Sequence, residues 1–465
     1  MSNPTHTPTT RREFLLTTGR FAAVSALAGV AIPNVHAAEN GTTQTALIGC
    51  GGRGTGAAFN ALSTKQIPLK LVAMADVFQN RLDDSYRSLK NNGAIGGQVD
   101  VTPERKFIGF DGYQKAMDCL KPGDIAIFTT PLPFRWVHFA YAIQKGLHVF
   151  MEKPLTADGP TSKRMLKLGA EASAKNLKVG VGLMSRHNRG MQELAHRIQD
   201  GELGDLILLR GYRMHGPGGS AYSTKWPGQP SELLWQIQRF HSFIWASGGC
   251  FNDFYIHHVD QCCWMKNAWP VKAQALGGRH YRHTGDGQLQ VDQNFDVYSV
   301  EYTFADGGKF IMDGRCINDC KEIYSSYAHG SKGSAIISSG GDCGLPSSIY
   351  KGQNQDPTSR IWESKVPGGE QDPYLNEWND LIDAIRNDKP YNEVERGVYA
   401  SAVSSLGRKA AHTGQEITLE QFMNSEQEYA PGVDKLTMNS PAPLQADADG
   451  RYPIPEPGIK RQAEY

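Results

Sequence analysis

The chain lacks an excess of charge of either sign and lacks a metal-binding pattern of cysteines. Its 465 residues include 48 lysines and arginines and 48 aspartates and glutamates, so the formal net charge is zero. Such a chain does not offer the long-range attraction that draws basic proteins to nucleic acids and anionic membranes, and neither partner is predicted. Eight cysteines are present, but they form no CxxC pair and no spacing typical of zinc ligands. We therefore predict no metal site and no specific disulfide.

Long hydrophobic runs are also missing. The apolar run at residues 21–32 is shorter than the roughly 18 to 20 residues that span a bilayer, so no permanent membrane anchor is predicted. The run follows Arg11-Arg12 and precedes the small residues of 35–38, as in a twin-arginine export signal with its cleavage site. A basic amphipathic first helix is the alternative. We predict that residues 1–38 are a removable signal and that the mature protein is soluble and periplasmic or otherwise exported.

The length of the chain predicts two domains with appendages, at roughly 100 to 200 residues per domain. Residues 41–184 alternate strand-like and helical patterns, which predicts an α/β domain with a doubly wound parallel sheet of the Rossmann type. Residues 185–430 change to hairpin-like patterns, such as 295–304 turning into 309–313, and predict an α+β domain with a large, mostly antiparallel sheet. The segment 431–465 is rich in proline and alanine and is predicted to be an extended arm with little core of its own.

A glycine-rich turn follows the first predicted strand, residues 45–48. It reads Gly49-Cys50-Gly51-Gly52-Arg53-Gly54 and satisfies G-x-G-x-x-G. In this context Gly49 permits a tight turn, and Gly51 lets the backbone approach a pyrophosphate. Gly54 allows close packing of a helix that we expect to begin near Thr55. The pattern predicts a nicotinamide dinucleotide site.

The second predicted strand, residues 69–75, is followed by Asp76. At this position a carboxylate can accept hydrogen bonds from both ribose hydroxyls of a dinucleotide. It would repel a 2'-phosphate, so we predict NAD rather than NADP, although the nearby Arg81 leaves NADP open. The alternative for Asp76 is a turn residue at a strand end.

A later strand, residues 147–151, delivers Glu152-Lys153-Pro154 at its carboxyl end, where open α/β sheets bind ligands. Joined to the glycine turn, Asp76 and Thr130-Pro131, this order resembles the glucose-fructose oxidoreductase, inositol dehydrogenase and MocA family, and the N-terminus and tail resemble its exported subgroup. The resemblance implies an NAD-dependent oxidoreductase of sugars or polyols. It also implies cofactor contacts at Gly49, Gly51, Gly52, Arg53, Gly54, Asp76, Thr130, Pro131, Glu152 and Lys153.

An Asp-x-x-x-His motif in the second half extends the resemblance. Asp253 and His257 lie four positions apart, so on a helix they share one face, with Asp260 one turn further as a support. A core histidine in a capped helix is the alternative, but the order of the motifs matches the family's catalytic residues. Tyr255 stands where many relatives have glycine, which alters the expected sugar pocket. His258 is expected to be structural.

These residues suit the oxidation of an alcohol. A base must take the hydroxyl proton while a hydride leaves the same carbon for the cofactor. His257 is the first choice, because the unperturbed pKa of histidine lies near 6.5 and Asp253 can orient its ring. Lys153 is expected to bind the substrate oxygen and can also move a proton, so the division of roles stays open. Arg186 is a further candidate for binding sugar hydroxyls.

Two other functions remain open. One is an NAD-recycling glycosidase, which would oxidise a sugar transiently, eliminate its substituent and reduce it again. The other is a non-catalytic sugar- or nucleotide-binding protein. Export favours a tightly retained cofactor, because free NAD is scarce outside the cytoplasm. Members of the resembled family pack subunits through their second sheet, so a homodimer or homotetramer is expected, whereas the identity of the sugar or glycoside is not encoded in any motif.

Overall fold

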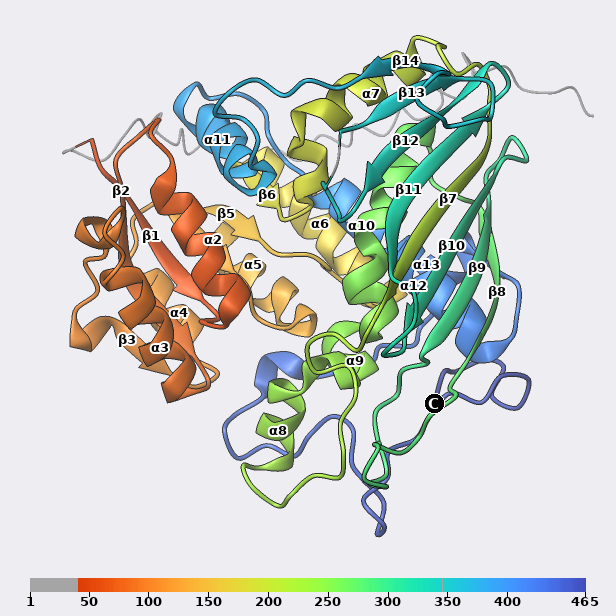
Figure 1. Cartoon of the computed structure of the whole chain (residues 1–465). Coiled ribbons are helices and arrows are strands. Elements are labelled where there is room, and N and C mark those ends of the chain that lie inside the picture. Colours follow the sequence, from red (N-terminus) through yellow and green to blue (C-terminus); the bar gives the residue numbers. More distant parts are fainter. Residues whose placement is uncertain (1–40, 345) are drawn as a thin grey trace, which may run out of the picture. The chain divides into compact units, whose positions relative to one another are not determined.

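The computed structural model describes residues 41–344 and 346–465. The predicted export signal, residues 1–38, lies outside this part of the chain. The described residues belong to one compact unit that contains two sheets (Figure 1). Of the helices in the described ranges, none combines the length and the apolar character needed to cross a membrane.

The first sheet has six parallel strands in the order β3-β2-β1-β4-β5-β6, which confirms the predicted doubly wound fold. The strands are β1 (Thr43–Ile48), β2 (Leu69–Asp76), β3 (Lys106–Ile108), β4 (Ile125–Phe128), β5 (His148–Met151) and β6 (Val179–Val181). The helices that connect them are α2 (Gly52–Ser63), α3 (Gln79–Lys90), α4 (Gly112–Asp118), α5 (Arg135–Lys145) and α6 (Gly159–Ala174). The strand order reverses between β1 and β4, and such a switch point is where open α/β sheets bind their ligands.

The second sheet has nine strands in the order β14-β13-β12-β11-β7-β10-β9-β8-β15. Apart from β7 and β10, which run parallel, the neighbouring strands are antiparallel, as predicted. The strands are β7 (Leu206–His215), β8 (Lys272–Gly278), β9 (Val297–Thr303), β10 (Lys309–Cys316), β11 (Ile323–Gly330), β12 (Gly333–Ser339), β13 (Ser348–Lys351), β14 (Arg360–Glu363) and β15 (Ile417–Thr418). The predicted hairpin of 295–304 and 309–313 is the antiparallel pair β9 and β10.

Seven α-helices follow the first sheet in the described chain: α7 (Arg189–Gln199), α8 (Glu232–Gln238), α9 (Ile244–Ser247), α10 (Gly249–Lys266), α11 (Pro373–Arg386), α12 (Val394–Thr413) and α13 (Leu419–Asn424). Helix α11 returns to the first sheet, where its Trp378 stacks on Phe150 of β5 with ring centroids 4.4 Å apart. The predicted boundary after Met184 thus follows the last strand of the first sheet, but later chain covers part of that sheet.

Helix α10 carries Asp253 and His257, and it is buried on nearly all sides. It contacts β7 and β11 on one side and α12 on another (Figure 1). Tyr255 of this helix is fully buried against Phe251 and Tyr298, and its hydroxyl lies 3.3 Å from Cys316 Sγ. The expectation that Tyr255 shapes the sugar pocket is therefore wrong, because its ring points into the core between helix and sheet.

The tail 431–465 has only one short 3-10 helix, η6 (Val433–Lys435). It contributes buried side chains to a core that it shares with other segments. Its Leu444 and Tyr452 belong to a buried cluster with Trp235 and Trp245, and its Glu464 is fully buried. Single apolar residues at irregular intervals anchor this segment, and such anchors leave no periodic pattern in the sequence.

Candidate active site

A cavity of about 650 Å³ lies at the switch point of the first sheet. Its walls include the glycine turn, Asp76 at the end of β2, and Thr130 and Pro131 after β4. This volume is within the range of pockets that hold small molecules and cofactors. The cavity therefore lies where the sequence predicts the dinucleotide.

The glycine turn has the conformation that its motif predicts. Gly49 has φ of +95°, and a Cβ there would lie 2.8 Å from Thr129 Oγ1. At Gly54 a Cβ would lie 2.1 Å from the carbonyl oxygen of Gly49, so α2 packs against the turn more closely than any side chain allows. Gly51 has nothing within 4 Å of such a Cβ and lines the cavity.

Helix α2 begins at Gly52, earlier than the predicted start near Thr55. Glycine has low helix propensity, but the close packing of Gly54 against the carbonyl oxygen of Gly49 holds this first turn in place. Gly51 is the N-cap, and no side chain caps the helix. Its first backbone N–H groups are therefore suited to an anionic group such as a pyrophosphate, which supports the fit of a dinucleotide to this cavity.

Hydrogen bonds from backbone N–H groups hold the Asp76 side chain beside the glycine turn. Its carboxylate accepts the N–H of Cys50 at 2.6 Å and the N–H of Phe78 at 2.9 Å. Burial raises the pKa of Asp76, and these two hydrogen bonds act against that rise. Arg81 lines the same cavity, and its guanidinium carbon lies 4.7 Å from the centroid of the Phe78 ring.

Lys153 and Asp253 meet although 100 residues separate them in the chain. Lys153 Nζ donates to the backbone oxygen of Asp253 at 2.6 Å and lies 3.6 Å from its carboxylate Oδ1. Both side chains are largely buried, at 15% and 12% exposure. These two predicted residues therefore lie together where the carboxyl end of β5 meets helix α10.

His257 lies near this ion pair, but it does not donate the expected hydrogen bond to the Asp253 carboxylate. Its Nδ1 is buried and has no hydrogen-bond partner among the described residues. Burial lowers the pKa of His257, while the charges of Asp342 and Lys153 act on it in opposite directions. The imidazole is therefore neutral near pH 7, the state that can accept a proton.

The imidazole that Asp253 does contact is that of His241, which the sequence did not single out. His241 lies in the 3-10 helix η5 (Phe240–Ser242), and its Nε2 is 3.2 Å from Asp253 Oδ2. Burial alone would raise the pKa of Asp253, but Lys153 and His241 hold it well below its ordinary value. No spacing or motif around His241 could have predicted this contact.

Two predicted residues are engaged in ion pairs within the chain. Arg186 makes a two-pronged contact with Asp260, at 2.9 and 2.7 Å, so Asp260 supports Arg186 instead of the Asp253 and His257 pair. Glu152 Oε1 lies 2.7 Å from Arg53 Nε and thereby joins the loop of Lys153 to the first turn of α2. A substrate contact by Arg186 stays a prediction. His258 Nε2 donates to the carbonyl of Tyr212 at 2.7 Å, as a structural residue would.

Sequence relatives are found among inositol dehydrogenases, whereas no family model matches the chain. Inositol 2-dehydrogenase of Corynebacterium glutamicum is 29% identical over 100 residues, which cover 22% of this chain and 29% of that protein. The chain thus matches less than a third of that relative's length. Inositol 2-dehydrogenase of Arthrobacter sp. is 22% identical over 340 residues, which cover 70% of this chain and 88% of the relative.

Solved structures share the fold at low identity. Myo-inositol 2-dehydrogenase from Lactobacillus plantarum has a TM-score of 0.57 at 20% identity, with 81% of this chain and 99% of that chain covered. Levoglucosan dehydrogenase, solved in complex with NADH and levoglucosan, has a TM-score of 0.58 at 16% identity, with 82% and 100% covered. These solved structures, both named as dehydrogenases, therefore show that this chain shares their fold.

Proposed function

We propose that the protein is an NAD-dependent oxidoreductase that acts on a hydroxyl carbon of a sugar or polyol and retains its cofactor tightly. The observation that carries this proposal is the arrangement of Lys153, which follows β5, with Asp253 and a neutral His257 of helix α10. Strand β5 belongs to the sheet whose switch point holds the glycine-lined cavity. Related proteins act on inositol or levoglucosan by their names, which supports a polyol-like substrate.

The choice of NAD is supported by Asp76. Its carboxylate lines the cavity beside the glycine turn, where it would bind ribose hydroxyls and repel a 2'-phosphate. The levoglucosan dehydrogenase that shares the fold was solved with NADH. When bound, the nicotinamide supplies two-electron redox chemistry that side chains alone do not provide.

The protein's own residues would orient the substrate and move its proton. The Lys153 ammonium would bind the reacting oxygen, because Asp253 fixes it from both the backbone and the carboxylate. His257 would take the hydroxyl proton, since its buried Nδ1 has no partner among the described residues and its pKa is lowered.

Export to the periplasm and assembly into a homodimer or homotetramer are part of the proposal. Export is supported by the paired Arg11-Arg12, the apolar run and the small residues before position 39. A twin-arginine route carries folded proteins, which suits an enzyme that must bind its cofactor before export. Assembly is supported by the family resemblance.

The test is to denature the purified protein and identify the released nucleotide together with its redox state. The intact protein is then mixed with free polyols, free sugars and glycosides. We expect bound NAD(H), and a change in its absorbance with a free sugar or polyol. A protein that contains and binds neither NAD nor NADP would contradict the proposal, and release of an aglycone without net redox change would indicate the recycling glycosidase instead.

A further inference from the structure

We infer that His241 is a positioning residue of the reaction centre, whose imidazole holds the Asp253 carboxylate in the orientation that faces Lys153. The inference rests on the proposed oxidoreductase function. Asp253 Oδ2 lies 3.2 Å from His241 Nε2, and Oδ1 lies 3.6 Å from Lys153 Nζ. The two oxygens thus have separate partners, and rotation of the carboxylate would break both contacts.

The contacts of the second ring nitrogen, Nδ1, determine which nitrogen of His241 carries the proton and donates the hydrogen bond. The backbone N–H of Ser220 donates to Nδ1 at 3.2 Å, and Ser220 Oγ lies 3.1 Å from the same atom. A ring nitrogen that accepts an N–H bond carries no proton, so the neutral imidazole has its proton on Nε2. His241 therefore donates to Asp253 without itself having to be charged.

The ring of His241 has little freedom to turn away. Its centroid lies 3.8 Å from that of Phe240 and 4.9 Å from that of Phe254. A Cβ at Gly219 would approach the ring to 2.8 Å, so the loop on that side leaves no space for a larger residue. The imidazole is thus held in place by packing as well as by hydrogen bonds.

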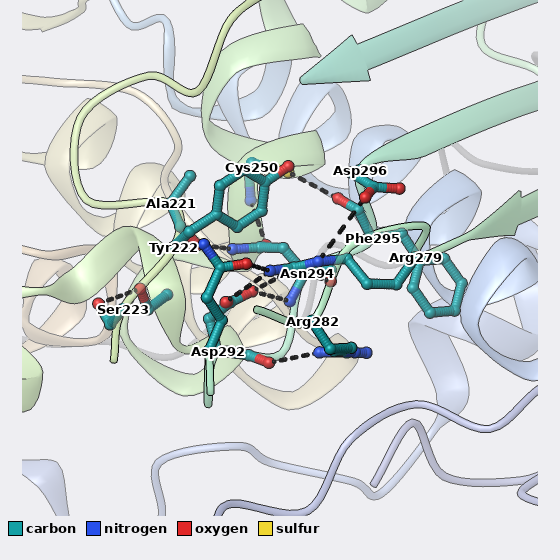
Figure 2. A network of polar contacts seen from close by, with 12 residues as sticks. Ala221, Tyr222, Ser223, Cys250, Arg279, Arg282, Asp292, Asn294, Phe295 and Asp296 are labelled. Carbon is teal, nitrogen blue, oxygen red and sulfur yellow. Dashed lines mark hydrogen bonds and ion pairs between the residues drawn. The ribbon is translucent and has the colours of Figure 1, made fainter. Parts of the chain in front are cut away.

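A buried polar network fixes the backbone of His241 to the helix that carries Asp253. Asn294 Nδ2 donates to the carbonyl of His241 at 2.8 Å, and Asn294 Oδ1 accepts the backbone N–H of Cys250 at 2.8 Å, in the first turn of α10. Figure 2 shows the side chain of Asn294 among these contacts, beside Ala221, whose carbonyl it also binds at 2.6 Å.

A buried ion pair supports Asn294 in turn. Asp292 accepts the backbone N–H of Asn294 at 3.1 Å and binds Arg279 Nη1 at 2.6 Å. Arg279 also lies over the ring of Tyr222 at 4.1 Å (Figure 2). A carboxamide with all of its polar atoms bonded in this way is rigid, so the distance between His241 and α10 is fixed.

Asp253 is faced by four groups that are or can become cationic. Lys153 approaches from the end of β5, Arg135 from α5 and His241 from η5, and His257 lies on the same helix. Of these, His241 makes a hydrogen bond with Oδ2. Loss of that donor would leave Oδ2 free to turn toward Lys153, which would tie up the ammonium that the substrate oxygen needs.

Two substitutions test the N–H donor and the aromatic ring of His241 separately. H241F keeps an aromatic ring against Phe240 and Phe254 but removes the N–H, whereas H241Q removes the ring and keeps an amide donor. We expect H241F to lower kcat about 10- to 100-fold, the value of a hydrogen bond to a charged group, with the content of bound nucleotide unchanged. We expect H241Q to retain most of the wild-type kcat. The control H283F, which replaces an exposed histidine, should have the wild-type kcat.

A second measurement does not depend on turnover. Aspartate labelled with carbon-13 at the carboxyl allows the Asp253 signal to be followed by NMR, with D253N identifying the signal. In wild type and H241Q we expect this carboxyl to stay ionised to the lowest pH at which the protein is folded. In H241F, protonation of the Asp253 carboxylate should begin at a pH about one unit higher than in wild type.

The outcomes distinguish this inference from the proposed function. The inference is overturned if the Asp253 carboxyl in H241F titrates as in wild type, or if H241F is more active than H241Q, because packing alone would give that order. A wild-type protein that oxidises no polyol, but whose Asp253 titration responds to H241F, would contradict the proposed function and support the role of His241.

Discussion

The cofactor cavity and the reaction centre differ in how the chain builds them. The cavity is lined mainly by short segments that follow β1, β2 and β4, and its critical features are backbone conformations such as that of Gly49. The reaction centre joins the side chains of Lys153, His241 and Asp253, each from a different element. Backbone conformation thus shapes the cavity, while contacts between side chains of distant elements form the proposed reaction centre.

The largest effect should come from removing the cation of the reaction centre. K153M keeps most of the side-chain volume but loses the ammonium, so kcat should fall about 1,000-fold, near the middle of the range for general acid–base groups. Lys153 was predicted to contact the cofactor, but it is not among the residues that line the cavity, so we expect bound nucleotide to be retained. Single-turnover kinetics and the nucleotide content check both expectations. An equal loss of cofactor would show that the two regions are not separable.

The next effect concerns the tail. Glu464 is fully buried and pairs with Arg408 at 2.9 Å, and Arg408 donates to the carbonyl of Gly248 before α10 and to that of Ala157. E464A leaves the guanidinium buried without its carboxylate, so the free energy of unfolding should fall by about 3 to 5 kcal/mol. Denaturant unfolding measures the change.

A matched control for this experiment is Glu456, which also lies in the tail. It pairs with Lys460 at 3.1 Å on the surface, so E456A should change the free energy of unfolding by less than about 1 kcal/mol. Equal effects of E464A and E456A would mean that the tail is the loosely attached arm that its composition suggests.

Two glycine substitutions sharpen the account of the cavity. G54A places a Cβ 2.1 Å from the carbonyl oxygen of Gly49 and should cost about 1 to 3 kcal/mol of stability, together with the bound cofactor. G51A meets no protein atom within 4 Å, so the protein should keep its thermal stability and lose only affinity for the dinucleotide. Calorimetry and nucleotide titration separate these effects, and normal NAD binding by G51A would contradict the predicted approach of the pyrophosphate.

The smallest effect is a shift of the pH profile. Burial lowers the pKa of His257, so the neutral base persists as the pH falls through 6.5, the ordinary value for histidine. We expect kcat/KM to hold at pH 6.5 and to decline only in more acidic solution, and H257N should abolish this acidic limb. A limb centred above pH 7 in wild type would argue against His257 as the base.

Parts of both regions were predictable because their signals are local. The glycine turn, Asp76 and Glu152-Lys153-Pro154 each follow a buried strand, and the carboxyl ends of parallel strands meet at one edge of a sheet. The start of α2 was predicted too late, because glycine has low helix propensity, whereas the helix begins at Gly52 and packs closely against Gly49 through Gly54. The expected effect of Tyr255 on the sugar pocket was wrong, because the replacement of a glycine does not indicate the direction in which the new side chain points.

The sequence by itself determined the order of strands and helices, the glycine turn and the positions of Lys153, Asp253 and His257, since each depends on periodicity or on a motif of a few residues. Only the tertiary structure decided that Asp253 is bound by His241 rather than by His257, and that Glu464 is buried. Those contacts join segments far apart in the chain. Their geometry depends on how two sheets and α10 pack, and no short pattern of residues records that packing.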